Sequence, residues 1–121
     1  MQNFRKIRHL FLFAACFGFP YSAESHALQN LPADTTFHIS SVHANRCLDV
    51  GGGGDSNGAA IIQFDCHHGP SEQFKLLPDG DAYQIKTMHG KCVDVFQWKT
   101  DNGAEVMQYD CQDGNNQKFF V

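Results

Sequence analysis

The sequence has few of the features on which membrane proteins, enzymes and nucleic-acid-binding proteins depend. Its longest apolar run, Leu10 to Phe19, has ten residues, whereas a helix that crosses a bilayer needs about 20. No HExxH motif and no Ser–His–Asp pattern with its nucleophile elbow occurs. Basic residues are scarce, with 9 Lys and Arg against 13 Asp and Glu. These absences argue against membrane insertion, against an enzyme and against a nucleic-acid partner.

The first 27 residues have the pattern of a secretory signal peptide. Three basic residues precede the apolar run, and the small residues Ser25 and Ala27 follow it at the spacing that a signal peptidase reads. The pattern predicts a signal peptide at 1–27, a short linker at 28–35 and export to an extracellular or periplasmic location. The remaining 94 residues carry 6 Lys and Arg and 12 Asp and Glu. Such an acidic surface does not attract nucleic acid.

An internal repeat with a period of 45 residues organises the exported part. Residues 47–76 and 92–121 align without a gap, with 11 of 30 positions identical and both cysteines in phase. A repeat is read before individual motifs, because it fixes which positions are equivalent. It divides the domain at 36–121 into repeats at 36–78 and 79–121.

The run of four glycines after Cys47 is not a phosphate-binding loop. Where the first repeat has GGGGDSNG, the second has FQWKTDNG, and neither continues into the lysine–hydroxyl pair and helix that a phosphate cradle uses. We interpret the glycines as a variable loop, and the shared Asn-Gly as a turn.

Four cysteines remain after the signal peptide, which is typical of a small secreted domain with two disulfides. Four cysteines allow three pairings, and spacing alone does not choose among them. The repeat favours the symmetric pairing, Cys47–Cys66 and Cys92–Cys111. A zinc site is not expected, since the cysteines of each pair lie 19 residues apart and His67-His68 is Gln112-Asp113 in the second repeat.

Short β-branched and aromatic segments separated by Gly, Pro, Asn and Asp predict an all-β domain. The expected strands are 36–42, 47–50, 60–64 and 73–76 in the first repeat, and 83–87, 92–95, 105–109 and 118–121 in the second.

Taken together, the motifs resemble the ricin-type β-trefoil lectin repeat. Each copy has Cys-[Leu/Val]-Asp-Val, then Asn-Gly-Ala, then Gln-[Phe/Tyr]-Asp-Cys, and finally a Gln-x-Trp-like triplet: Glu72-Gln73-Phe74 or Gln117-Lys118-Phe119. The resemblance covers about 36–121 and implies an incomplete β-trefoil, with two of the three repeats present. It also implies that the triplet aromatics, Phe74 and Phe119, are core residues, with Ile39, Val50, Ile85 and Val95 nearby.

The resemblance further implies one shallow sugar site per repeat. In the family, an aspartate accepts hydrogen bonds from sugar hydroxyls, an aromatic ring stacks on the sugar, and an asparagine and a glutamine complete the site. These roles fall on Asp94, Tyr109, Asn116 and Gln117 in the second repeat, and on Asp49, Phe64, Ser71 and Glu72 in the first. The first repeat thus departs from the pattern at two positions.

Other positions leave alternatives open. Ile62 and Met107 stand where many family members carry a glutamine, and strand alternation predicts that Gln63 and Gln108 face the other way. Gln117 has a structural alternative, bonding to backbone. Trp98 either walls the second site or packs against its own loop.

The predicted function is a non-catalytic lectin that binds galactose-type or related glycans or glycoproteins, without cofactor or metal. The alternative is a scaffold that binds or inhibits another protein and has no sugar site. For the third repeat there are three explanations: self-association or a partner chain, a two-repeat barrel, or a shortened reading frame of a longer lectin.

Overall fold

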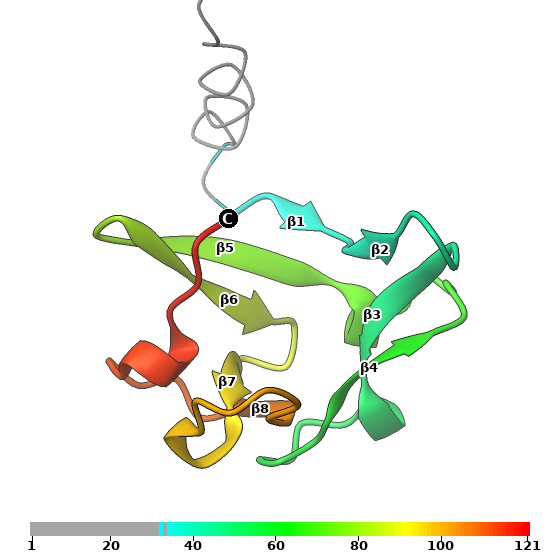
Figure 1. Ribbon diagram of the computed structural model, residues 1–121. Helices are drawn as coiled ribbons and strands as arrows, with labels where there is room; N and C mark the ends of the chain where they lie inside the picture. Colours follow the sequence, from blue (N-terminus) through cyan, green and yellow to red (C-terminus); the bar gives the residue numbers. More distant parts are fainter. Residues whose placement is uncertain (1–31, 33) are drawn as a thin grey trace, which may run out of the picture. The chain divides into compact units, whose positions relative to one another are not determined.

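The computed structural model describes residues 32 and 34–121, whose compact unit begins at Asp34. The predicted signal peptide lies outside the described residues, and so does most of the predicted linker. The described residues form eight strands in two sheets (Figure 1). The strands are β1 (Thr36–Phe37), β2 (Ser40–Ser41), β3 (Arg46–Val50), β4 (Ile61–Phe64), β5 (Phe74–Asp79), β6 (Ala82–Thr87), β7 (Cys92–Val95) and β8 (Val106–Tyr109).

The two sheets do not coincide with the two repeats, because β1 and β5, from the first repeat, pair in the same sheet as β6, β7 and β8. One has the order β2-β3-β4, and the other the order β1-β5-β6-β7-β8. Figure 1 shows the long β5–β6 hairpin across the upper part of the domain, with the β3–β4 and β7–β8 hairpins beneath it. Four short 3-10 turns lie between the strands: η1 (Gly51–Gly53), η2 (Pro70–Glu72), η3 (Phe96–Trp98) and η4 (Asn115–Gln117). The same sequence of strand, turn and strand therefore occurs twice.

The strand register is identical in the two repeats. Asp49 lies opposite Ile62 in the β3–β4 pair, and Asp94 lies opposite Met107 in the β7–β8 pair. Each hairpin is closed by a disulfide, Cys47–Cys66 in the first repeat and Cys92–Cys111 in the second. The symmetric disulfide pairing and the all-β class are confirmed.

Two predicted strands differ in the structure. The segment 36–42 is divided into β1 and β2, and 118–121 forms no strand. In the last segment only Phe119 pairs, in an isolated bridge with Tyr83. Sequence pattern overstated both segments, because a strand needs a neighbour along its whole length to form a ladder.

The core is small. The largest fully buried apolar side chain is Phe74, and Val50 is also 0% exposed, so both core predictions are confirmed. Phe119, predicted as its counterpart, is only half-buried, as are the other predicted core residues: Ile39, Ile85 and Val95.

Gln108 joins the two repeats. Its side chain is completely buried. It donates to the carbonyl oxygens of Gly54 and Ser56, at 2.9 and 3.0 Å, and accepts from Thr87 Oγ1 at 3.1 Å. Its backbone also bonds to the first-repeat loop: its carbonyl accepts a hydrogen bond from the Gly58 amide, and its amide donates to the carbonyl of Ala59. The glycine-rich loop is thereby attached to β8.

Within the described part of the chain, none of the helical segments has the length and hydrophobicity required to cross a membrane.

Candidate functional site

Two hollows lie at equivalent places in the two repeats, and we call them the first and the second hollow. Their volumes are about 340 and 310 Å³. The first is lined by Asp49, Gly52, Gly53, Ile62, Phe64, His67 and Ser71. The second is lined by Asp94, Phe96, Gln97, Trp98, Met107, Tyr109, Gln112 and Asn116. Every residue of the first set has its counterpart, 45 positions later, in the second set, so the hollows are products of the same fold.

Each hollow has a recessed carboxylate and a projecting aromatic ring. Asp49 and Asp94 are 5% and 3% exposed, whereas Phe64 and Tyr109 are 52% and 43% exposed. The strand pairing places the two side chains on the same face of one hairpin, because the aspartate pairs with the residue two positions before the aromatic. An acceptor at the bottom and a flat apolar wall at the side form an arrangement that can hold a polar ring with one apolar face.

In the second hollow Asp94 is held from behind by Gln117. This glutamine is 0% exposed and does not line the hollow. Its Nε2 donates to Asp94 Oδ2 at 2.8 Å and to the carbonyl of Asp110 at 2.9 Å, and its Oε1 accepts from the amide of Gln112 at 2.9 Å. The other oxygen of Asp94, Oδ1, has no hydrogen-bond partner within the described residues. Gln117 is therefore placed to orient Asp94, while Oδ1 stays available to a ligand.

Asn116 lies next to this carboxylate in the second hollow. It is 9% exposed, and its Nδ2 makes only a long contact, 3.5 Å, to the carbonyl of Val95. Its Oδ1 is buried and has no hydrogen-bond partner among the described residues. A buried acceptor without a donor is costly.

Loop backbone in both hollows is left-handed at two successive residues. Gly52 and Gly53 have φ of 78° and 65°, and their counterparts Gln97 and Trp98 have φ of 52° and 57°. Glycine adopts this conformation without strain, whereas other residues do so at a cost of about 1 kcal/mol or more each. The glycine run therefore has a conformational reason that its interpretation as a variable loop did not include.

The strained pair in the second repeat presents Trp98 to the hollow. Its side chain is 57% exposed and lines the second hollow. A Cβ on Gly114 would lie 2.6 Å from Trp98 Cζ2, so glycine there makes room for the indole. Of the two alternatives for Trp98, the structure supports the wall of the hollow, and backbone strain at such a site is typical of functional positions.

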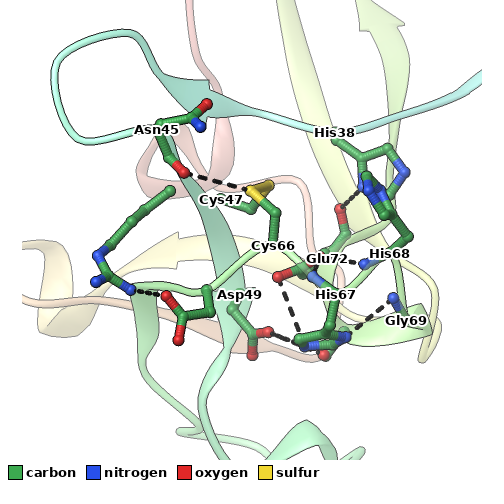
Figure 2. Close-up of a disulfide and its surroundings, with 12 residues drawn as sticks. His38, Asn45, Cys47, Asp49, Cys66, His67, His68, Gly69 and Glu72 are labelled. Atoms are coloured by element: carbon green, nitrogen blue, oxygen red, sulfur yellow. Dashed lines mark hydrogen bonds and ion pairs between the residues drawn. A yellow bond between two sulfur atoms is a disulfide. The ribbon is translucent and has the colours of Figure 1, made fainter.

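In the first hollow the carboxylate is held by different groups. Asp49 Oδ2 lies 2.8 Å from His67 Nε2 (Figure 2). It also accepts a hydrogen bond from Ser71 Oγ at 3.1 Å. His67 Nε2 also lies 3.5 Å from Glu72 Oε1. Sequence comparison of the repeats did not single out His67. It used the difference between His67 and its counterpart Gln112 only as evidence against a metal site.

Glu72 replaces Gln117 and is likewise 0% exposed. Its Oε2 accepts from the amides of His67 and His68, at 2.9 and 2.8 Å. Burial acts to raise the pKa of the Glu72 carboxyl, but these amide bonds and the two nearby imidazoles outweigh it, and the pKa lies below its ordinary value of 4.5. Glu72 is therefore ionised at neutral pH, close to a second buried carboxyl group.

The three residues Asp49, His67 and Glu72 also form a set of metal-ligand type, with ligand atoms within 4.8 Å of one another. However, the amide of Gly69 donates to His67 Nδ1 at 3.0 Å (Figure 2). Nδ1 must then be unprotonated, so the neutral imidazole carries its proton on Nε2. A metal on Nε2 would move that proton to Nδ1, against another donor, whereas histidine ligands normally donate from their second nitrogen. The geometry favours a proton over a metal ion.

The chain is similar to several solved structures. It resembles a designed three-fold symmetric protein, ThreeFoil, with 32% identity and a TM-score of 0.66, over 69% of this chain and 61% of that one. It also resembles 1,3Gal43A, an exo-β-1,3-galactanase from Clostridium thermocellum, with 28% identity and a TM-score of 0.67, over 75% and 21%. A Polyporus squamosus lectin matches in fold, with 19% identity and a TM-score of 0.60, over 73% and 31%. The chain thus spans about three fifths of the designed protein and less of the other two.

Comparison with curated proteins gave no match. The fold is that of a ricin-type, lectin-like β-trefoil, which supports a carbohydrate-binding domain in general. The family described as ricin-type beta-trefoil lectin domain-like matches residues 27–109, which is more than half of the chain. The protein belongs to this family.

Proposed function

We propose that the protein is a non-catalytic lectin whose second hollow binds a galactose-type pyranose. The observation that carries the proposal is the pairing of a recessed Asp94, with one oxygen available, and a half-exposed Tyr109. Vicinal sugar hydroxyls donate to a carboxylate, while the C–H face of the ring stacks on an aromatic side chain. The galactanase among the similar structures is named for a galactose polymer, which makes galactose the first sugar to test.

Trp98 and Asn116 complete this site in the proposal. Trp98 gives a second aromatic wall, and its left-handed backbone conformation would be difficult to explain if the indole only covered its own loop. Asn116 lines the hollow and gives an amide side chain that a sugar hydroxyl can contact. We also propose that the protein is exported, since its two disulfides are compatible with an extracellular protein.

Calorimetric titration with galactose and lactose, with glucose as the competing sugar, tests the proposal. A hydrogen bond to a charged group contributes about 1.5–3 kcal/mol, so Asp94→Asn should weaken binding roughly 10- to 100-fold. Tyr109→Ala should weaken it similarly, through lost stacking. Asp101→Asn, an exposed carboxylate in the neighbouring loop and outside both hollows, is the matched control and should leave affinity unchanged.

A protein partner is the second candidate, favoured by the apolar Ile62 and Met107 in the hollows. Sugar binding that is absent, together with protein binding that survives both substitutions, would support this candidate and contradict the lectin proposal.

A further inference from the structure

We propose that Asn102 is a modification site, at which ring closure onto the Gly103 amide converts the asparagine to aspartate and isoaspartate. The pair Asn-Gly occurs twice in the chain, as Asn57-Gly58 and as Asn102-Gly103. Ring closure is least hindered in this pair, because glycine has no Cβ. The two copies have the same turn but different contacts, and this difference carries the proposal.

The local conformation of the two pairs is the same. In each copy an amide that follows the glycine closes the turn, with an N–O distance of 3.4 Å in the first repeat and 3.3 Å in the second. Gly58 and Gly103 occupy the same position, with φ of 87° and 82°. Both asparagines are exposed. Neither turn geometry nor exposure to water therefore distinguishes Asn57 from Asn102.

Asn57 is held by the second repeat. Its Nδ2 donates to Asp110 Oδ2 at 2.9 Å. The amide of Gly58, which is the nucleophile in ring closure, donates to the carbonyl of Gln108 at 2.8 Å. The amide must lose its proton and the side chain must turn toward it, so both hydrogen bonds have to open before Asn57 can react.

Asn102 has neither restraint. Its side chain and the Gly103 amide make no hydrogen bond with any other part of the chain that the structure describes. A Cβ placed on Gly103 would meet no atom within 4 Å, whereas one on Gly58 would lie 3.9 Å from Met107 Sδ. The Asn102 side chain and the Gly103 amide can therefore approach each other without breaking such a bond.

The reaction is an intramolecular acyl transfer followed by hydrolysis. The Gly103 nitrogen gives its proton to hydroxide and attacks Cγ of Asn102. As the N–Cγ bond forms, the Cγ–Nδ2 bond breaks, and the side-chain nitrogen leaves as ammonia after taking a proton from water, which restores the hydroxide. Water then opens the cyclic imide. Attack at Cγ gives aspartate, and attack at the main-chain carbonyl carbon gives isoaspartate, in which the main chain runs through Cγ.

The modified loop connects two walls of the second hollow. Asn102 stands between η3, which ends at Trp98, and β8, which contains Met107, and both of these residues line the hollow. Either product adds a negative charge to the loop, and isoaspartate also adds a carbon to the main chain. Trp98, the single tryptophan, should report the change by its fluorescence. The inference does not depend on what the hollow binds.

Peptide mapping of the aged protein by mass spectrometry tests the inference. The folded protein at mildly alkaline pH is compared with the same protein in concentrated guanidinium chloride, where the fold protects neither site. Two hydrogen bonds must open at Asn57, so the ratio of the rates at Asn102 and Asn57 should exceed its unfolded value at least about fivefold. A smaller increase would overturn the inference. The pairs Asp79-Gly80 and Asp113-Gly114 close the same ring with loss of water, so their mass is unchanged and they are not counted.

Variants separate local restraint from overall stability. Asp110→Ala removes the acceptor of Asn57 Nδ2 and should accelerate the reaction at Asn57 roughly 2- to 10-fold, with the rate at Asn102 unchanged. Asp65→Ala, at the exposed counterpart in the first repeat, is the matched control and should leave both rates unchanged. Asn102→Gln should abolish the reaction at that position and keep Trp98 fluorescence constant on ageing.

Two further results would overturn the inference. One is equal acceleration at Asn57 and Asn102 in the Asp110→Ala variant, which would mean that general stability and not local bonding sets the rates. The other is an Asn102 that stays intact in the folded protein but reacts in guanidinium chloride.

Discussion

Replacing Gln117 with glutamate gives the second repeat the carboxyl group that Glu72 provides in the first, without the histidine that accompanies it. The loss in the free energy of unfolding follows from the geometry. The new carboxyl oxygen would lie about 2.8 Å from Asp94 Oδ2, the position that Gln117 Nε2 now occupies. If both groups stayed ionised, the repulsion at an effective dielectric constant of about 20 would be about 6 kcal/mol. Taking up a proton at pH 7 instead costs about 3.7 kcal/mol, from an ordinary glutamate pKa of about 4.3. Protonation costs less than the repulsion, so we expect a loss of about 3.7 kcal/mol in the free energy of unfolding at pH 7.

The pH dependence of this loss identifies its cause. Proximity to Asp94 raises the folded-state pKa of the introduced carboxyl above its unfolded value, so the penalty is largest at neutral pH and shrinks as the pH falls toward about 4.3. At pH 5 the loss should be about 1 kcal/mol. Urea unfolding, followed by far-ultraviolet circular dichroism and by the fluorescence of the single tryptophan, measures both values.

A second substitution completes the test. Adding Gln112→His to Gln117→Glu reproduces the first-repeat pair of His67 and Glu72, and should recover about 1–2 kcal/mol. Gln112→Ala in the same background is the control and should recover nothing. A loss below about 1 kcal/mol at pH 7, a loss that does not change with pH, or equal recovery with alanine would refute the reasoning.

Three further predictions concern stability. Each disulfide joins cysteines 19 residues apart, so reduction should cost about 3 kcal/mol per bridge, and an unchanged urea midpoint in excess thiol would contradict this. Folding lowers the pKa of the Glu72 carboxyl. The ionised carboxylate therefore stabilises the folded state at a pH above the unfolded-state pKa, and this stabilisation is lost as the pH falls through the folded-state pKa. Glu72→Gln should make the free energy of unfolding less sensitive to acid between pH 6 and 2. Gln108→Ala removes three side-chain hydrogen bonds and should cost about 2–4 kcal/mol and accelerate hydrogen exchange at Gly58, whereas the same change at the exposed counterpart Gln63 should cost less than about 0.5 kcal/mol.

Much of the fold follows from the repeat alone. Once Cys47 and Cys92 are aligned, the symmetric disulfide pairing follows from the repeat. The aspartate and the aromatic residue of each hairpin share one face, because the aspartate pairs with the residue two positions before the aromatic. Local sequence is sufficient for these features because each depends on residues within one hairpin. Strand alternation predicted only that Gln63 and Gln108 face away from the hollows; that Gln108 is buried while Gln63 is exposed depends on contacts with the other repeat.

The chemistry of the first hollow does not follow from pattern matching. His67 gains its role from contacts with Asp49, Glu72 and the Gly69 amide, and the comparison of repeats recorded only that the glutamine was missing. Pattern matching scores each position separately, whereas a hydrogen-bond network can be preserved by several substitutions together. The left-handed backbone at Trp98 could not be predicted from the sequence either, because it depends on tertiary contacts such as the one with Gly114.

The position of Gln108 means that the two hollows are linked to each other. Its side chain donates hydrogen bonds to the carbonyls of Gly54 and Ser56, which directly follow the glycines of the first hollow. The residues on either side of it in the sequence, Met107 and Tyr109, line the second hollow. Gln108 therefore connects the glycine loop of the first hollow to β8, the strand that carries Tyr109. With sugar bound in the hollows as proposed, occupancy of one is expected to alter the affinity of the other through this connection.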